Sequence, residues 1–200
     1  MTNRKLTMFT GIIETLGTVR NLKKNSGNLE MEIACNFVNQ LALGQSIAHN
    51  GVCLTVTHLY DNYYAATAID ETLHKTNLGE LQIGDMINLE RCMPANGRFD
   101  GHIVQGHADG KGVCKSIIEE NGSWKFEFIY NDKTQITIPK GSICVNGVSL
   151  TVVDSTNESF SVAIIPYTFE HTNFKNIKQG SSVNLEFDVI GKYIQKILGK

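Results

Sequence analysis

The sequence predicts an all-β protein made of two tandem copies of one domain, followed by a C-terminal helix. The first observation is a repeat, because residues 46–56 (SIAHNGVCLTV) recur as residues 142–152 (SICVNGVSLTV). The second is a series of short segments in which apolar and polar residues alternate. The third is a stretch near the C-terminus whose apolar residues recur with helical spacing.

The repeat keeps a constant spacing along the chain. Cys53 matches Ser149 and Thr72 matches Thr168, each pair 96 positions apart, so no insertion separates these points. This period exceeds those of solenoid repeats, which makes a duplicated domain the better interpretation. Each copy of about 90 residues can hold a modest core of its own. We therefore expect two similar binding surfaces in one chain.

The composition argues against several functional classes. The chain has 18 Lys and Arg against 20 Asp and Glu, and its net charge of −2 does not favour a nucleic-acid or membrane-surface partner. Its apolar runs are strand-sized, so no transmembrane helix is expected, and residues 1–7 lack the apolar segment of a secretory signal. The cysteines are odd in number without C-x-x-C spacing, which favours reduced thiols in a cytoplasm. They are Cys35, Cys53, Cys92, Cys114 and Cys144.

Alternation and turn signals justify the β elements. Residues 29–35, 124–130 and 183–187 alternate at period two, which is typical of half-buried strands. Asn-Gly pairs favour tight hairpin turns, because both residues can take positive φ. Many short strands with frequent turns predict antiparallel β structure, either a sandwich or a small closed barrel. The pairs lie at 50–51, 96–97, 121–122 and 146–147.

Two kinds of segment differ from the strands. Residues 70–78 and 166–174 each read as a short helical turn, and Pro166 suits an early helical position. Residues 94–97 form a loop-like cluster that marks the boundary between copies. We therefore divide the chain into an N-terminal extension (1–7), a first barrel (8–97), a second barrel (98–187) and a C-terminal segment (188–200).

The C-terminal segment reads as an amphipathic helix. Its apolar residues fall on one helical face: Ile190, Tyr193, Ile194, Ile197 and Leu198. One interpretation packs this helix on its own barrel. The other, which we adopt, makes it an oligomerisation helix.

Several ordered motifs resemble the riboflavin synthase family. They are residues 8–14 (MFTGIIE), 50–56 (NGVCLTV), 101–107 (GHIVQGH) and 147–152 (GVSLTV). Any one motif alone is weak, but their order together with the duplication is specific. The resemblance covers the chain from residue 8 to its end.

The resemblance implies a fold, an assembly and a reaction. The fold is two similar six-stranded Greek-key β-barrels followed by a C-terminal helix. The assembly is a homotrimer with sites between the first barrel of one subunit and the second barrel of its neighbour, with possible association with lumazine synthase. In the reaction, two molecules of 6,7-dimethyl-8-ribityllumazine exchange a four-carbon unit and give riboflavin and 5-amino-6-ribitylaminouracil. No cofactor and no metal are implied.

A reaction between two identical molecules needs two similar half-sites, because orientation supplies much of the rate enhancement. The substrates still play different roles, so residues that differ between the copies are informative. Neutral drift explains each difference equally well. The differing pairs are Cys53 and Ser149, His49 and Val145, Lys140 and Gly44, Asp188 and Cys92, and, with a one-residue offset, His107 and Ile12.

His107 is the first candidate for catalysis. A proton must leave the C7 methyl group of one lumazine and a nucleophile must add to the other, and histidine can serve near neutral pH. The alternative is a turn histidine held by backbone groups. Cys53 is a nucleophile or polar contact, or equally a small buried strand residue. Ser46 matches a family serine near the lumazine ring, although Ser142 at the equivalent place favours a turn role.

Lys140 and Asp188 complete the catalytic candidates. Lys140 could stabilise developing negative charge, whereas a lysine after proline is usually just solvated. Asp188 could bind ribityl hydroxyls or orient Lys140, and otherwise caps the terminal helix. The other histidines are assigned structural or exposed roles: His49, His58, His74, His102 and His171.

Matching positions in the family imply the rest of the pocket. From the first copy these are Gly11, Ile12, Ile13, Cys53, Leu54, Thr55, Thr67, Ala68, Ile69, Asp70, Glu71, Thr72, Gly106, His107 and Ala108. From the second copy they are Lys140, Ser149, Leu150, Thr151, Ile164, Ile165, Pro166, Tyr167, Thr168 and Phe169. Threonines recur at equivalent places in both copies, although threonine is common in strands.

Two departures from the family pattern and two competing functions complete the interpretation. Asn146 stands where many members carry Asp, and Asp100 where a second Gly is frequent. The main alternative to the enzyme is a non-catalytic lumazine- or flavin-binding protein, similar to the lumazine proteins of luminous bacteria. A generic β-barrel interaction module is a weaker alternative. Retention of His107, Cys53 and the paired threonines favours the enzyme.

Overall fold

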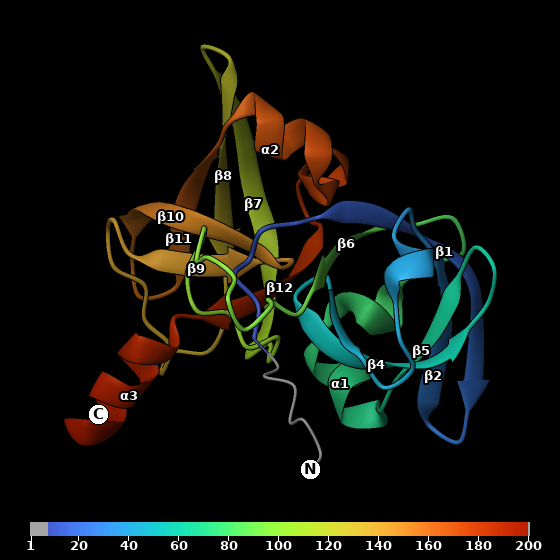
Figure 1. The fold of residues 1–200 in the computed structure, drawn as a ribbon. Helices are drawn as coiled ribbons and strands as arrows, with labels where there is room; N and C mark the ends of the chain where they lie inside the picture. Colours follow the sequence, from blue (N-terminus) through green and yellow to red (C-terminus); the bar gives the residue numbers. More distant parts are fainter. Residues whose placement is uncertain (1–7, 200) are drawn as a thin grey trace.

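Two closed six-stranded antiparallel barrels form the body of the molecule, and a short helix projects from the second one (Figure 1). The computed structural model describes residues 8–199, and the predicted N-terminal extension lies outside them. Read from the first strand of each barrel, the rings have the same order: β1-β2-β5-β4-β3-β6 and β7-β8-β11-β10-β9-β12. The predicted all-β architecture of tandem six-stranded barrels with a C-terminal helix is confirmed.

The elements of the two copies correspond one to one. The first barrel comprises β1 (Thr15–Asn25), β2 (Asn28–Ala34), β3 (Ser46–His49), β4 (Val52–Leu59), β5 (Tyr64–Ala68) and β6 (Met86–Arg91), with 3-10 helix η1 (Val38–Gln40), helix α1 (Asp70–Lys75) and 3-10 helix η2 (Asn77–Glu80). The second comprises β7 (Gly110–Glu120), β8 (Ser123–Ile129), β9 (Ser142–Val145), β10 (Val148–Ser155), β11 (Ser159–Ile164) and β12 (Ser182–Phe187), with α2 (Pro166–His171) and η3 (Asn173–Asn176). Helix α3 (Val189–Ile197) follows, and the predicted division at residue 97 falls in the linker between β6 and β7.

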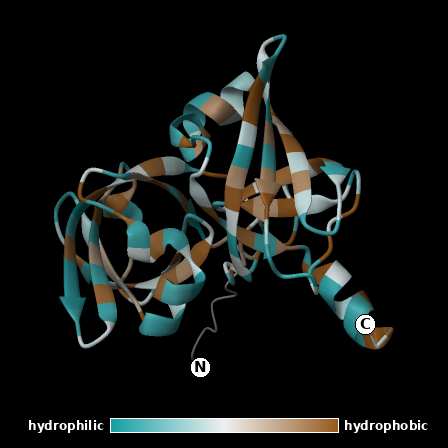
Figure 2. Ribbon diagram, turned by 180° about the vertical axis from the view of Figure 1, so that it is seen from behind, coloured by the Kyte–Doolittle hydropathy of each residue, from teal (hydrophilic) through white to brown (hydrophobic). Residues whose placement is uncertain are grey.

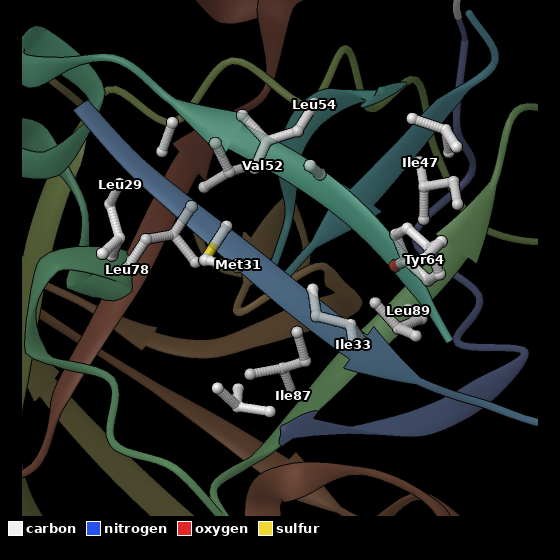
Figure 3. Close-up of a cluster of buried hydrophobic side chains, with 14 of the residues drawn as sticks. Leu29, Met31, Ile33, Ile47, Val52, Leu54, Tyr64, Leu78, Ile87 and Leu89 are labelled. Carbon is white, nitrogen blue, oxygen red and sulfur yellow. The ribbon is translucent and has the colours of Figure 1, made fainter. Parts of the chain in front are cut away.

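Alternation along the strands fills the barrel interiors. In β2, Leu29, Met31 and Ile33 point into the first core, which Figure 3 shows in close-up. Their polar neighbours face outward, and Figure 2 shows apolar and polar residues alternating along several strands. The second core is more aromatic, with Phe126 and Phe128 packed around Phe174. Each barrel therefore has a complete core of its own.

The predicted helical turns are each a short α-helix followed by a 3-10 turn. Thr76 forms the junction in the first copy, because its hydroxyl donates to Thr72 O at 2.6 Å and accepts from Leu78 N at 3.3 Å. Thr172 does the same in the second copy. Pro166 occupies the first turn of α2, where a missing N–H costs no helical hydrogen bond.

The Asn-Gly pairs differ in what they do. Asn50, Asn121 and Asn146 have φ near +47°, as expected for tight hairpin turns. The pair at 96–97 instead lies in the linker, where Gly97 N donates to Pro94 O at 2.8 Å. Between β1 and β2 the turn is made by Ser26 (φ 48°) and Gly27 (φ 89°), which the Asn-Gly pattern does not reveal.

Buried asparagines join the barrels about a pseudo-twofold axis. Asn88 Nδ2 donates to Asn146 O at 2.8 Å and to Asn173 Oδ1 at 2.9 Å. From the other copy, Asn184 Nδ2 donates to Asn50 O at 2.9 Å. The two Asn-Gly turns at 50–51 and 146–147 therefore meet head to head as well as closing their hairpins.

Candidate functional site

Each barrel is preceded by a leading segment that packs on the barrel of the other copy. The segments are residues 9–13 and residues 104–108, and they bridge each other through Phe9 and Val104. Ile13 packs against the core of the second barrel, and Ala108 packs against the core of the first. The two leading segments are thus exchanged between the copies.

Two glycines make this exchange possible. Gly11 O accepts a hydrogen bond from Ser149 N at 2.8 Å, and Gly106 O accepts one from Cys53 N at 2.8 Å. Both glycines have φ of +77°, and a Cβ on either would lie 2.6 Å from the Cβ of its partner. Only glycine fits this close approach. The offset of 95 between Gly11 and Gly106 sets Ile12 and His107 at equivalent places.

Two buried glutamates anchor the leading segments. Glu90 on β6 accepts from Thr10 N at 2.7 Å and Gly11 N at 3.0 Å. Glu186 on β12 accepts from the N–H groups of residues 105, 106 and 107 at 2.6, 3.0 and 2.9 Å. Burial raises the pKa of Glu90 to about 7, opposed by the Thr10 and Gly11 donors. Burial also raises the pKa of Glu186.

Sequence reasoning assigned no role to this glutamate pair. Each glutamate follows three buried residues of its strand, 87–89 in β6 and 183–185 in β12, and is itself buried. A charged residue at a buried strand position is a signal that it has specific partners. That signal identifies Glu90 and Glu186 without an alignment.

The first half-site lies on the outer face of β3, β4 and β6. Cys53 and Thr55 alternate with inward residues on β4, and Ser46 at the start of β3 pairs with Thr55 on β4. Cys92 Sγ donates to Ser46 O at 3.4 Å. His107 is exposed, next to the Gly106 that covers Cys53. The structure thus places Ser46, Cys53 and His107 in one neighbourhood.

The thiol of Cys53 is held mostly in its protonated form. Burial raises its pKa, a hydrogen bond with the Ser46 side chain opposes this, and the charge of Glu186 adds to it. The thiolate is the nucleophilic form of cysteine. A raised pKa therefore favours a polar contact by Cys53 over thiolate attack.

The second half-site is the equivalent face of the second barrel. Ser149 and Thr151 lie on β10, with Lys140 in the loop before β9. Lys140 is exposed and has φ of +67°, and its amide donates to Val152 O. Gly44, its counterpart, has φ of +76° and makes the same backbone contact with Val56. Lysine thus occupies a conformation that favours glycine.

Asp188 forms the N-cap of α3. Its carboxylate accepts from Ile190 N at 3.0 Å, which is the capping alternative expected from its position. The charge of Asp188 also acts on His102, whose Nδ1 lies 2.6 Å from Ser149 Oγ. Sequence reasoning assigned His102 a structural or exposed role, but the structure brings it into the second half-site.

The remaining predicted binding residues divide by orientation. The side chains of Leu54, Ala68 and Ile164 point into the barrel cores, so only their backbone atoms could reach a ligand. Leu150 is half-buried against the second core. Phe169 is likewise half-buried against that core. The outward or helix-starting residues remain accessible as side chains: Thr55, Thr67, Ile69, Asp70, Glu71, Thr72, Thr151, Ile165, Pro166, Tyr167 and Thr168.

The copies also differ at the base of this helical turn. Phe169 stacks on Trp124 with ring centroids 3.9 Å apart. The corresponding residues of the first copy are Leu73 and Leu29, beside a cavity of about 390 Å³ that they help to line. A second cavity, of about 470 Å³, is lined by Ile12, Glu90, Cys92 and the linker.

The described residues also bear on the other predicted features. All five cysteines are free thiols. Within residues 8–199, His, Cys, Asp and Glu side chains do not gather in threes to hold a metal ion. Among the helices of that range, none is long and apolar enough to cross a membrane.

Comparison with known proteins identifies the family. Residues 10–92 and 105–188 each match the model of the lumazine binding domain. The riboflavin synthase of Actinobacillus pleuropneumoniae is 47% identical over 195 residues, which cover 96% of this chain and 91% of the relative. The chain belongs to the riboflavin synthase family. The riboflavin synthase of Bacillus subtilis (strain 168) is 41% identical with the same coverage.

Solved structures with the same fold include two of LumP. The complex with 6,7-dimethyl-8-(1'-D-ribityl) lumazine has a TM-score of 0.82 at 23% identity, covering 90% of this chain and 98% of LumP. The complex with riboflavin has a TM-score of 0.83 at 24% identity, covering 90% and 99%. At these identities the likeness establishes a shared fold.

Proposed function

We propose that this protein is a riboflavin synthase, a transferase that converts two 6,7-dimethyl-8-ribityllumazine molecules to riboflavin and 5-amino-6-ribitylaminouracil. The observation that carries the proposal is the pair of equivalent half-sites, each built from one barrel and completed by the leading segment of the other copy. Two similar half-sites suit a reaction that consumes two copies of one substrate. Near full-length identity of 41–47% to riboflavin synthases supports the same activity.

The differences between half-sites suit the different roles of the two substrates. In the first, exposed His107 can accept or donate a proton, and Cys53 offers a thiol. In the second, Lys140 offers a positive charge to the lumazine carbonyls, and Ser149 offers a hydroxyl. The threonines shared by both copies can bind the parts that the two lumazines have in common.

We also propose that the active unit is a homotrimer held together by α3. The helix contacts its own barrel through polar groups, as Lys192 Nζ lies 2.6 Å from Asp109 Oδ2 and Gln195 donates to Thr134 O. Its apolar face stays 51–81% exposed: Ile190, Tyr193, Ile194, Ile197 and Leu198. Another subunit would cover such a face. Lumazine sites would then form between neighbouring subunits.

The proposal also includes a location in the cell and a protein partner. A cytoplasmic location is supported by the five free thiols. Association with lumazine synthase stays a prediction, because it rests on the family resemblance alone.

The purified protein incubated with 6,7-dimethyl-8-ribityllumazine as its only substrate is expected to produce riboflavin, followed by its fluorescence. Lumazine binding without turnover would contradict the enzyme and support a lumazine-binding protein instead. A His107→Ala protein is expected to bind lumazine but to turn it over far more slowly. Undiminished turnover by that variant would remove His107 from the catalytic group.

A further inference from the structure

The second half-site contains a hydroxyl–imidazole pair that has no counterpart among the described residues of the first half-site. His102 Nδ1 lies 2.6 Å from Ser149 Oγ, a short hydrogen bond between a loop residue and a strand residue. Ser149 is the counterpart of Cys53, whose side chain is instead near Ser46 and Cys92. With the offset of 95 seen in the leading segments, the position equivalent to His102 is Thr7, so the first copy has no imidazole there.

Backbone contacts of residues 101 and 102 hold the His102 imidazole next to Ser149. His102 N donates to Thr10 O at 3.1 Å, which ties the loop to the other leading segment. A Cβ on Gly101 would lie 2.0 Å from Thr10 O and 2.9 Å from Ser149 Cβ. Glycine before His102 is therefore a condition of the contact.

We propose that His102 is a positioning residue of the second half-site, which fixes the direction of the Ser149 hydroxyl toward the bound lumazine. The inference rests on the proposed function. In one imidazole tautomer Ser149 donates to Nδ1, and its oxygen can accept from an N–H or O–H group of the ligand. The proposal requires this tautomer, with the imidazole proton on Nε2, because an Nδ1 that donates to Ser149 would leave the hydroxyl proton free to rotate. With Ser149 donating to Nδ1, the hydroxyl is no longer a free rotor.

Protonation disturbs this arrangement in a defined way. An imidazolium has no acceptor for the Ser149 proton. Burial lowers the pKa of His102, and the charge of Asp188 opposes this. Thr10 and Ser149 contribute only neutral groups, so Asp188 is the charged residue that faces His102 from the elements packed against it. Neutral imidazole therefore prevails at neutral pH.

The test is a double-mutant cycle on His102 and Ser149 in the full-length protein. Alanine at either position is expected to lower kcat by about 10-fold to 100-fold, and the double variant is expected to be no slower than the worse single variant. His102→Asn keeps a polar atom near the place of Nδ1, and it should recover most of the loss. Additive effects in the cycle would overturn the proposal. His58→Asn is the matched control, because His58 Nδ1 contacts Thr57 Oγ1 on the exposed face of β4.

A pH profile separates positioning from a purely structural role. The wild-type kcat should fall at acid pH as His102 protonates, and that limb should be lost in His102→Asn. Glu90 and Glu186 remain in both proteins, so the difference between the profiles reports His102. Identical profiles would contradict the proposal.

A binding readout keeps this test separate from that of the proposed function. Equilibrium dialysis with riboflavin should give equal losses of affinity for His102→Ala and Ser149→Ala and no further loss in the double variant. If the wild-type protein does not turn over lumazine, the proposed function fails, while this cycle still decides the pairing. Independent losses of affinity would refute the pairing even in an active enzyme.

Discussion

Removing the carboxylate of Glu186 tests whether its clamp, the hydrogen bonds to the backbone of residues 105–107, positions His107, the proposed catalytic histidine. In Glu186→Ala, three N–H groups lose their acceptor at once. The matched control is Glu90→Ala, which removes the same kind of clamp from Thr10 and Gly11. The two clamps differ in the side chain that they position, which is His107 in one case and Ile12 in the other.

The structure sets the scale of both effects. An orphaned buried donor costs about 1–3 kcal/mol, and water entering the vacated space favours the lower limit. The three N–H donors to Glu186 therefore imply a loss of about 3 kcal/mol in the free energy of unfolding of Glu186→Ala. Glu90→Ala should lose a similar amount, because Glu90 accepts from Thr10 N, Gly11 N and the Thr10 hydroxyl. A shift of about 1 Å in a reacting group can cost about 100-fold in rate. Glu186→Ala should accordingly lose 10-fold or more in kcat, and Glu90→Ala should lose affinity for substrate more than kcat.

Urea unfolding and steady-state kinetics measure the two quantities on the same samples. Glu186→Gln adds a conservative variant, because an amide oxygen can still accept from the N–H groups of Gly106 and His107. It is expected to recover most of the lost kcat. Equal kcat values for the two alanine variants would refute the positioning of His107 by Glu186.

Three other features of the molecule can be tested by deletion, substitution and titration. Deleting residues 189–200 should shift the particle toward monomer and abolish turnover, and an unchanged mass by light scattering would contradict the role of α3. Gly147→Ala should destabilise the protein by about 1–3 kcal/mol, because its Cβ would lie 2.7 Å from Gly51 N, and an unchanged urea midpoint would contradict this. The pKa of the Glu90 carboxyl is about 7 in the folded protein and 4.5 ordinarily, so the folded state binds the carboxyl proton more tightly. The stability that this proton contributes is complete below pH 4.5 and is lost as the pH rises through 7. Urea titrations at pH 5 and pH 8 should show about 2.5 kcal/mol of this loss in wild type and not in Glu90→Gln, and equal pH dependence in the two proteins would refute it.

The repeat predicted the fold well because the same local pattern occurs twice. Alternation placed β2, β8 and β12 correctly, since a strand period is a local property. The offset of 95 in the leading segments was visible in the sequence. The exchange of those segments between barrels was not, because it depends on contacts between residues far apart in the sequence, such as Gly11 with Ser149.

The site was less predictable for the same physical reason. The pocket residues implied by the family form continuous stretches, which take no account of strand alternation. They therefore include Leu54, Ala68 and Ile164, whose side chains face the cores. His102 was set aside because nothing in its local sequence reports a partner 47 residues away. Turn chemistry also does not reveal that two of the Asn-Gly pairs, at 50–51 and 146–147, meet across the barrel interface.

The number of lumazines consumed for each riboflavin formed tests the paired half-sites most directly. Quantitative chromatography of a complete reaction measures the lumazine lost and the riboflavin and 5-amino-6-ribitylaminouracil gained. Two unlike half-sites acting on two copies of one substrate predict two lumazines consumed for one molecule of each product. Riboflavin formed from a single lumazine, or without the uracil product, would contradict this account.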